Sequence, residues 1–395
     1  MPRFEPFTAL RYASSLPLAK VVAPPYDVLS DSDVVALLNS HPRNIVAIDV
    51  PRDVDGPKRY ELAGKRLTDW VSDGSLVRDP QPSFTLYRTR FTDEAGVQRE
   101  TVGVLGGLEV VDEGAGGVLP HERTIPKAKT DRLDLTRATN TNLSPIWGLS
   151  LAAGLTGLLR AAGEPMGSCV DENGVVHTVE RVSDLERIAT IAQAVASSTV
   201  LIADGHHRYA ISRTFRDEVR ATRGTDTPAE LTLTYVAELV EDQLSIDAIH
   251  RLYHGISADD LLTILRKSFD TADAGTVTPA FSSEVVRRGA LCLVRPDGTG
   301  VWLTPRPTAF TGQRGLDGAY LEHALRNSAI DVSYQHGVQH VVEAVRQSDA
   351  TVGVLIRPTS IVEIRRTANE GLLMPPKSTF FTPKLRTGLA LRPLT

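Results

Sequence analysis

TVLIADGHHRYA, residues 199–210, joins an apolar run to Asp-Gly, two histidines and an arginine. The run before Asp204 has the β-branched and apolar residues that are typical of a buried strand. Apolar residues then recur at helical spacing over 209–219, which predicts a helix directly after the turn. Between the two lies Gly205, and glycine allows a sharp turn or a close approach of the backbone to a ligand. We therefore predict a strand, a tight turn and a helix.

The polar residues of this turn suit the binding of an anion. A helix N-terminus presents unpaired N–H groups and the positive end of the helix dipole, and Arg208 can bind phosphate oxygens in bidentate fashion. At the strand end, Asp204 could position a metal ion such as Mg²⁺, a hydroxyl group or His206. Together with His207 these residues predict a phosphate-binding turn in a catalytic or nucleotide-binding site.

A structural interpretation of the same residues stays open. Asp-Gly before a helix is a common turn and cap, and a single histidine is more often structural than catalytic. Four polar groups at one strand exit favour the functional interpretation, because such groups contribute little to packing.

Composition limits the classes of protein to which the chain can belong. Its 395 residues are enough for two or three domains, and 42% hydrophobic with 23% charged residues predicts a folded core. A net charge of −5 argues against a dedicated nucleic-acid-binding protein. The two cysteines lie far apart and form no CxxC pair, which fits a reducing cytoplasm and excludes a zinc ribbon. No stretch is apolar for long enough to cross a membrane, so we expect a cytoplasmic protein.

Hydrophobic periodicity predicts an α/β or α+β fold with a mixed sheet core and an additional α/β region. We expect an N-terminal α/β domain over 1–252 and a C-terminal α/β region over 253–395, whose tail (371–395) packs back on the body. The expected helices are 33–39, 58–71, 185–196, 258–267, 318–327, 338–347 and 360–369. The expected strands are 83–91, 101–110, 144–151, 199–203, 231–240, 290–295, 300–303 and 352–356.

Residues 121–132 form a second candidate segment, which we expect to be an exposed loop leading into a helix. The carboxylate of Glu122 stands beside His121 among four cations, namely Arg123, Lys127, Lys129 and Arg132. Cations neutralise phosphate charge while a carboxylate accepts a proton from an attacking hydroxyl, so this composition suits phosphoryl transfer. A solvated loop with weak, exchanging ion pairs is the alternative.

Metal-ligand spacing is otherwise absent, because Ile125 stands where a zinc HExxH motif requires histidine. Asp27 or Asp204 could still hold Mg²⁺ together with substrate phosphates. The chain contains no Walker A loop and no GxSxG elbow, which disfavours ordinary P-loop and α/β-hydrolase enzymes.

The segment 374–384 is too apolar and too rich in proline for an idle tail. We expect it to fold back and close the site, with Lys377, Ser378 and Lys384 near the substrate. A plain docking strand is the alternative.

Several of these runs resemble one bacterial family, the "domain of unknown function ten-fifteen". The resemblance extends from the first residues to the last. The motifs that carry it are VAPPYDV at 22–28, PHERT at 120–124, KTDRL at 129–133, ADGHHRY at 203–209 and MPPKST at 374–379. The turn at 204–208 is also similar to the nucleotide-phosphate turn of the ParB/sulfiredoxin superfamily, which includes free-serine kinases.

This resemblance implies that Asp204 to Arg208 cradle phosphates and that the activity is phosphoryl transfer to a small hydroxyl substrate such as free L-serine, from pyrophosphate or a nucleotide. Glu122 as the general base rests on chemistry alone. Mg²⁺ is a possible cofactor, and we expect no tightly bound organic cofactor. A phosphohydrolase with the same site and a nucleotide-regulated ParB-like protein remain alternatives, although we find no helix-turn-helix pattern for DNA. We expect the 121–132 loop and the C-terminal segment to meet the turn.

Overall fold

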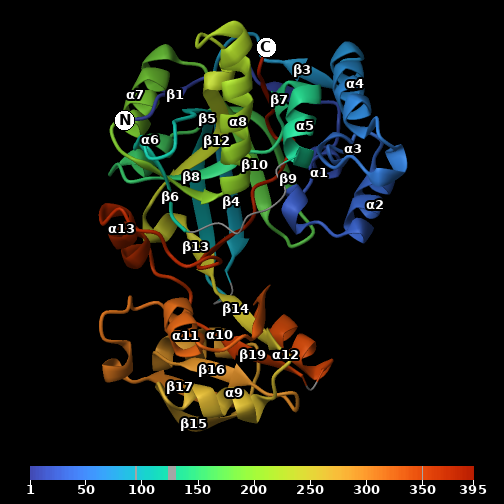
Figure 1. Ribbon diagram of the computed structural model, residues 1–395. Helices are drawn as coiled ribbons and strands as arrows, with labels where there is room; N and C mark the ends of the chain where they lie inside the picture. Colours follow the sequence, from blue (N-terminus) through green and yellow to red (C-terminus); the bar gives the residue numbers. More distant parts are fainter. Residues whose placement is uncertain (94–95, 123–129, 349) are drawn as a thin grey trace. The chain divides into compact units, whose positions relative to one another are not determined.

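The computed structural model describes residues 1–93, 96–122, 130–348 and 350–395 (Figure 1). The chain forms two compact units. The first unit contains residues 1–92, 98–244 and 383–395, and the second contains residues 93–97 and 245–382. The chain therefore returns to the first unit at Pro383 for its last residues.

A mixed sheet forms the centre of the first unit. Within the described residues it has nine strands, of which β6 with β11 and β8 with β12 pair in parallel while the other pairs are antiparallel. The strands in spatial order are β6 (Val118–Pro120), β11 (Val200–Asp204), β8 (Ile146–Ser150), β12 (Leu231–Glu238), β5 (Gln98–Glu109), β4 (Phe84–Thr92), β10 (Val176–Val182) and β9 (Glu164–Val170), with β1 (Phe4–Glu5) on β5.

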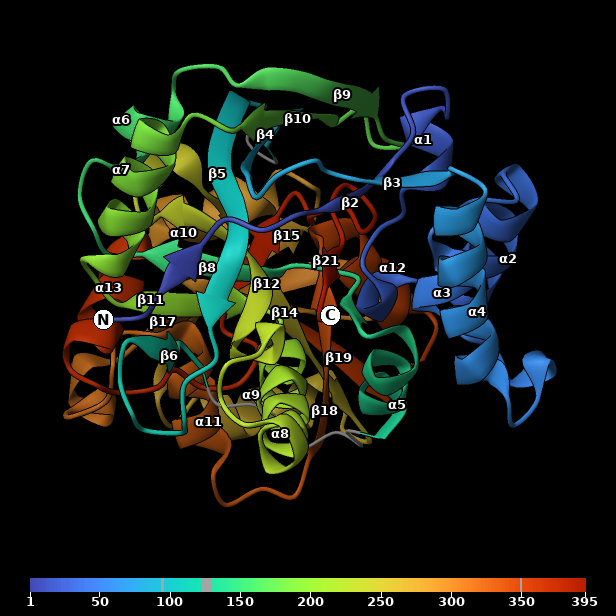
Figure 2. The same cartoon turned by 90° about the horizontal axis from the view of Figure 1, so that it is seen from above.

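Helices flank this sheet on two sides. Figure 2 shows α6 and α7 on one side of β5, and α2, α3 and α4 on the other. The helices of the first unit are α1 (Leu18–Val21), α2 (Asp31–Ser40), α3 (Val46–Asp49), α4 (Arg59–Ser72), α5 (Thr130–Thr139), α6 (Leu155–Leu159), α7 (Leu185–Ala196) and α8 (His206–Arg223).

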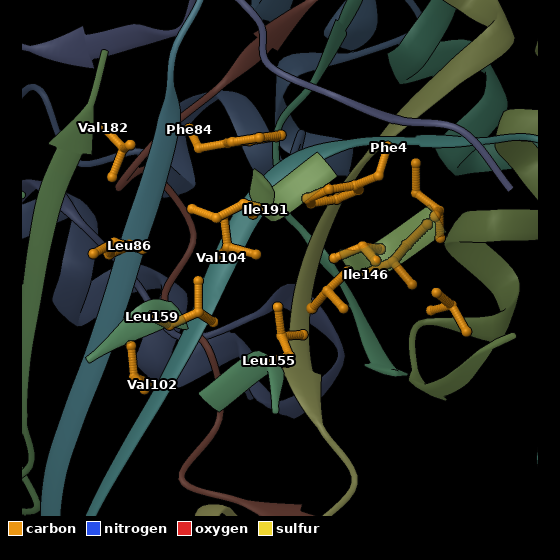
Figure 3. Packing of buried hydrophobic residues seen from close by; sticks show 14 of the residues in the cluster. Phe4, Phe84, Leu86, Val102, Val104, Ile146, Leu155, Leu159, Val182 and Ile191 are labelled. Atoms are coloured by element: carbon orange, nitrogen blue, oxygen red, sulfur yellow. The ribbon is translucent and has the colours of Figure 1, made fainter. Parts of the chain in front are cut away.

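One core cluster fixes α6 and α7 against the sheet (Figure 3). Phe4 and Phe84 stack with ring centroids 5.1 Å apart. The Asp184 side chain caps α7 by accepting a hydrogen bond from the Arg187 backbone N–H at 2.8 Å. Ile188, Ile191 and Val195 then recur on one face of α7 and are buried in this cluster, as an amphipathic helix requires.

The last residues of the chain pair with N-terminal segments of the first unit. Leu391 exchanges backbone hydrogen bonds with Leu10, and Thr387 does so with Ala23. The first unit also contains two short sheets of two strands each. In one, β21 (Arg392–Pro393) pairs with β7 (Thr141–Asn142), and in the other, β2 (Leu10–Tyr12) pairs with β3 (Leu76–Arg78).

The second unit has an antiparallel sheet between two helical layers. Residues of α9 and α11 pack into one core cluster of this sheet, and residues of α10 and α12 pack into another. The strand order is β15 (Phe269–Thr276), β17 (Thr299–Pro305), β16 (Leu291–Val294), β19 (Thr351–Leu355), β14 (Ile249–His254) and β18 (Asp331–His336), and β13 (Ser245–Asp247) pairs with β20 (Phe380–Thr382). The helices are α9 (Ala258–Leu265), α10 (Phe281–Arg288), α11 (Asp317–Leu325), α12 (Val338–Arg346) and α13 (Ile361–Asn369).

The predicted fold class, a mixed α/β core with an additional α/β region, is confirmed by these sheets and helices. The units divide between Leu244 and Ser245, whereas the sequence suggested 252/253, because β14 is an inner strand of the second sheet. Among the described residues, no helix combines the length and the apolar character that crossing a membrane requires.

Two helical glycines give a test of this packing. A Cβ added at Gly64 in α4 would lie 2.4 Å from the Ala138 backbone oxygen in α5, whereas one at Gly157 in α6 meets nothing within 4 Å among the described residues. Alanine favours a helix over glycine by roughly 1 kcal/mol, but a clash of this kind costs about 1–3 kcal/mol. Gly64→Ala should therefore lower the free energy of unfolding in urea denaturation, and Gly157→Ala should not. Equal effects of the two substitutions would contradict the α4–α5 contact.

Candidate functional site

The turn at the end of β11 has the geometry expected from its sequence. Gly205 has a φ of +89°, in the left-handed region that favours glycine, and α8 begins at the next residue. A Cβ at Gly205 would lie 3.0 Å from Arg208 Nε. The absence of a side chain at Gly205 thus lets the Arg208 guanidinium fold back over the turn.

Asp204 is held between two cations. Arg208 Nη2 donates to Oδ2 of Asp204 at 2.6 Å, and Lys384 Nζ donates to Oδ1 at 3.2 Å. Burial alone would raise the pKa of Asp204, but Lys384 and Arg208 together hold that pKa well below its usual range. The carboxylate is therefore ionised, and these three side chains carry a net charge of +1 at the N-terminus of α8, which favours an anion.

The other Arg208 contact ties the turn to the next strand, since Arg208 Nη1 donates to the Pro145 carbonyl just before β8. The segment that carries Lys384 has anchoring contacts of its own. Two residues later, Arg386 pairs with Asp171 at 2.6 Å, and its backbone N–H donates to Tyr87 Oη at 3.1 Å. The hydroxyl of the buried Tyr87 lies 2.8 Å from His177 Nδ1.

His121 lies at the end of β6, the parallel neighbour of β11. Its Nδ1 is 2.6 Å from the Ile202 carbonyl oxygen. A carbonyl can only accept, so Nδ1 carries the proton of the neutral imidazole. Burial lowers the pKa of His121, and its Nε2 lies 3.7 Å from Glu122 Oε2.

His206, the first residue of α8, packs against this histidine with ring centroids 5.1 Å apart. Burial, and then the neighbouring His121, lower the pKa of His206 to about 3. Its Nε2 is buried without a hydrogen-bond partner among the described residues. A buried polar atom of this kind is uncommon in folded proteins and marks a place where a ligand or water can bind. His207 follows in α8 and is partly buried.

A polar pocket adjoins Arg208. Arg132 Nη1 donates to the Asp49 backbone oxygen at 2.6 Å and to Asp49 Oδ1 at 2.9 Å, and the guanidinium lies 3.4 Å above the Tyr26 ring centroid. The pocket has a volume of about 50 Å³. Its lining residues are Tyr26, Asp49, Arg132, Leu135, Thr136, Thr141, Asn142, Leu143, Ser144, Ile146, Arg208, Ile211, Ser212 and Thr232.

Other predicted site residues are placed as follows. Lys127 and Lys129 lie outside the described residues, as does Arg123. Lys377 and Ser378 belong to the second unit, where the Ser378 carbonyl accepts a hydrogen bond from Thr359 Oγ1 at 2.7 Å. Asp27 is exposed on the short helix η1 (Tyr26–Val28).

The protein side chains at this turn would by themselves make a poor ligand set for Mg²⁺. Both oxygens of Asp204 already face cations. Within the described ranges no group of three or more His, Cys, Asp or Glu residues could hold a metal ion. A Mg²⁺ ion at this turn would need most of its oxygen ligands from the phosphates of a substrate.

Sequence reasoning missed the role of Asp49 and its contact with Arg132. Asp49 ends a four-residue helix and carries no local motif, so its burial beside a guanidinium was not visible in the pattern. Tyr26 lies within the VAPPYDV motif at 22–28, but nothing in that motif indicates that Arg132 stacks on its ring.

The family model described as "Protein of unknown function (DUF1015)" matches residues 4–349. A free serine kinase in complex with AMP has 12% sequence identity and a TM-score of 0.37, over 69% of this chain and 89% of that chain. SbnI with a C-terminal truncation, from Staphylococcus aureus, has 14% identity and a TM-score of 0.39, over 72% and 87%. A conserved hypothetical protein from Pyrococcus furiosus has 11% identity and a TM-score of 0.37, over 69% and 92%. No curated protein matches the chain significantly.

A pair of glycines tests whether the turn binds an anion. Gly154 has a φ of +88° at the N-terminus of α6, but a Cβ there meets nothing within 4 Å among the described residues. Gly205→Ala and Gly154→Ala should each lose about 1–2 kcal/mol of stability from backbone strain. Only Gly205→Ala should also displace Arg208 and weaken the binding of pyrophosphate or ADP at least tenfold in calorimetric titration. Unchanged affinity in Gly205→Ala would contradict the assignment.

Acid should destabilise the site through His206. Its pKa is about 3 in the folded protein and about 6.5 when unfolded, so the unfolded state binds more protons between these values. Stability should fall as the pH drops below about 6.5, by up to about 1.4 kcal/mol per pH unit for this residue. Urea denaturation from pH 7 to 4.5 should show a shallower decline in His206→Gln, and parallel declines would contradict a neutral His206.

Proposed function

This chain belongs to the DUF1015 family of proteins of unknown function, and we propose that it transfers a phosphoryl group to the hydroxyl of a small molecule, in the first instance free L-serine. The observation that carries the proposal is the pairing of Asp204 with both Arg208 and Lys384 at a glycine turn that opens a helix. Two cations on one ionised carboxylate leave positive charge for a phosphate donor.

The donor would lie against the first turn of α8. Backbone N–H groups of that turn, Arg208 and Lys384 would neutralise the charge on the transferred phosphoryl group. Any Mg²⁺ would arrive with the donor and supply further charge neutralisation. We propose pyrophosphate or a nucleotide as the donor, so that the bond from phosphorus to the leaving phosphate breaks as the bond to the acceptor oxygen forms.

Proton transfer would occur on the histidine side of the turn. The acceptor hydroxyl must lose a proton as it attacks phosphorus, and we assign Glu122 as the base that takes it. His121 lies beside this carboxylate, with its Nε2 3.7 Å from Glu122 Oε2 and its Nδ1–H fixed by the Ile202 carbonyl. The neutral state of His121 and His206 keeps further positive charge away from that base.

We choose serine because the turn at 204–208 is similar to the phosphate-binding turn of the ParB/sulfiredoxin superfamily, which includes free-serine kinases. Water in place of the hydroxyl would make the same site a phosphohydrolase, because the anion-binding groups would be identical.

A phosphorus NMR assay tests the proposal. Purified protein with Mg²⁺ and L-serine is offered pyrophosphate, ADP and ATP in turn, and phosphoserine should appear with one of them. Arg208→Gln should lower the rate about 10²–10³-fold, and Glu122→Gln should lower it about 10²–10⁴-fold. The matched control is Arg213→Gln on the same helix, whose guanidinium pairs at the surface with Glu113 and should leave the rate unchanged.

Other outcomes would redirect or end the proposal. Free phosphate without phosphoserine, lost in Arg208→Gln, would indicate a phosphohydrolase. Absence of turnover with every donor, or equal losses in Arg208→Gln and Arg213→Gln, would contradict phosphoryl transfer at this turn.

A further inference from the structure

We infer that the pocket between Tyr26, Asp49, Arg132 and Arg208 binds a small α-amino acid through its carboxylate. The identification of that ligand as the acceptor rests on the proposed function, but its binding does not. The pocket shares Arg208 with the turn at Asp204, so an amino acid held here lies beside the phosphate-binding groups.

The charges that line the pocket suit one carboxylate. Arg132 and Arg208 bring two guanidinium groups to the pocket, of which Arg132 is paired with the buried Asp49 and Arg208 with Asp204. Because both cations are already paired, the pocket offers N–H donors without a large excess of positive charge, which suits a single carboxylate. A pyrophosphate group carries several negative charges and would leave charge uncompensated in a partly buried place.

Donors for that carboxylate are present on both sides. The Nε atoms of Arg132 and Arg208 are buried and have no hydrogen-bond partner among the described residues. Guanidinium groups bind carboxylates through paired N–H donors. Hydroxyl and amide side chains, among them Ser144 and Asn142, complete the lining.

The size of the pocket limits the ligand. A volume of about 50 Å³ is a few times the roughly 10–15 Å³ that one water molecule needs. It accommodates the end of a small molecule and is too small for a nucleoside, so a nucleotide donor would have to place its nucleoside outside this pocket.

Asp27 provides the group that distinguishes an amino acid from other carboxylates. It follows Tyr26 on η1, and its negative charge acts on both Arg208 and Asp49. The structure gives the Asp27 carboxylate no hydrogen bond or ion pair among the described residues. It is exposed, next in the chain to Tyr26, which lines the pocket. An α-ammonium group beside a bound carboxylate would pair with it.

Calorimetric titration of the full chain tests this inference with three small ligands. L-Serine carries both charged groups, serinamide lacks the carboxylate, and D-glycerate lacks the ammonium. L-Serine should bind the native protein at least tenfold more tightly than either analogue. Arg132→Gln should weaken L-serine at least tenfold and pyrophosphate less than threefold, while Asp27→Asn should weaken L-serine but not D-glycerate.

Two further variants distinguish a loss of binding from a loss of folding. Ser144→Leu fills the pocket and leaves the Asp49–Arg132 contact in place, so it should abolish L-serine binding with an unchanged circular dichroism spectrum. Arg137→Gln on the same helix as Arg132 removes surface pairs with Asp134 and Glu218 and should leave binding unchanged.

Two other results would overturn the inference. Loss of pyrophosphate rather than L-serine in Arg132→Gln would make the pocket part of the donor site. Failure of L-serine, L-threonine and D-glycerate all to bind the native protein would exclude a carboxylate site, whatever the phosphorus assay shows. Tight L-serine binding without any phosphoryl transfer would instead reject the proposed function and retain the pocket.

Discussion

The pairing of Asp204 with Arg208 and Lys384 is the contact on which the candidate site depends. It joins the end of β11, the first turn of α8 and the C-terminal segment, which is 180 residues away from Asp204 along the chain. Because partly buried charges are costly when unpaired, loss of Asp204 would leave both cations without this partner. The first unit is complete at this turn only with residues 383–395, which follow the second unit in the chain. Arg386, anchored to Asp171 and Tyr87, holds that returning segment in place.

The turn separates two chemical environments. On one side, His121 and His206 are kept neutral by burial, and Glu122 adjoins His121. On the other side, Arg208 and Arg132 line a polar pocket with hydroxyl groups. A site that binds an anion at its centre, moves a proton on one side and recognises a small polar molecule on the other can be assembled from these parts. The first two parts begin from local features, namely a glycine turn, a helix start and a histidine at a strand end, whereas the pocket depends on a contact between residues distant in the chain.

The sequence predicted the elements that carry local signals. The β11–Gly205–α8 unit follows from an apolar run, a glycine and helical spacing, and the predicted α/β class is confirmed. The strands that the sequence analysis missed include β9, β10, β14, β15 and β18. Strand β9 contains Pro165 and Gly167, and β15 is largely polar. The Asp49–Arg132 and Asp204–Lys384 contacts join residues distant in the chain, so spacing alone could not pair them, although Lys384 had been placed near the substrate. The role of the site residues stays a prediction.

A crystal structure of the protein with Mg²⁺ and ADP, or with pyrophosphate, tests the central claim most directly. We predict a phosphate group at the N-terminus of α8, within hydrogen-bond distance of Arg208 and Lys384, with the Gly205 turn unchanged. A phosphate bound elsewhere, out of reach of Arg208 and Lys384, would contradict this prediction.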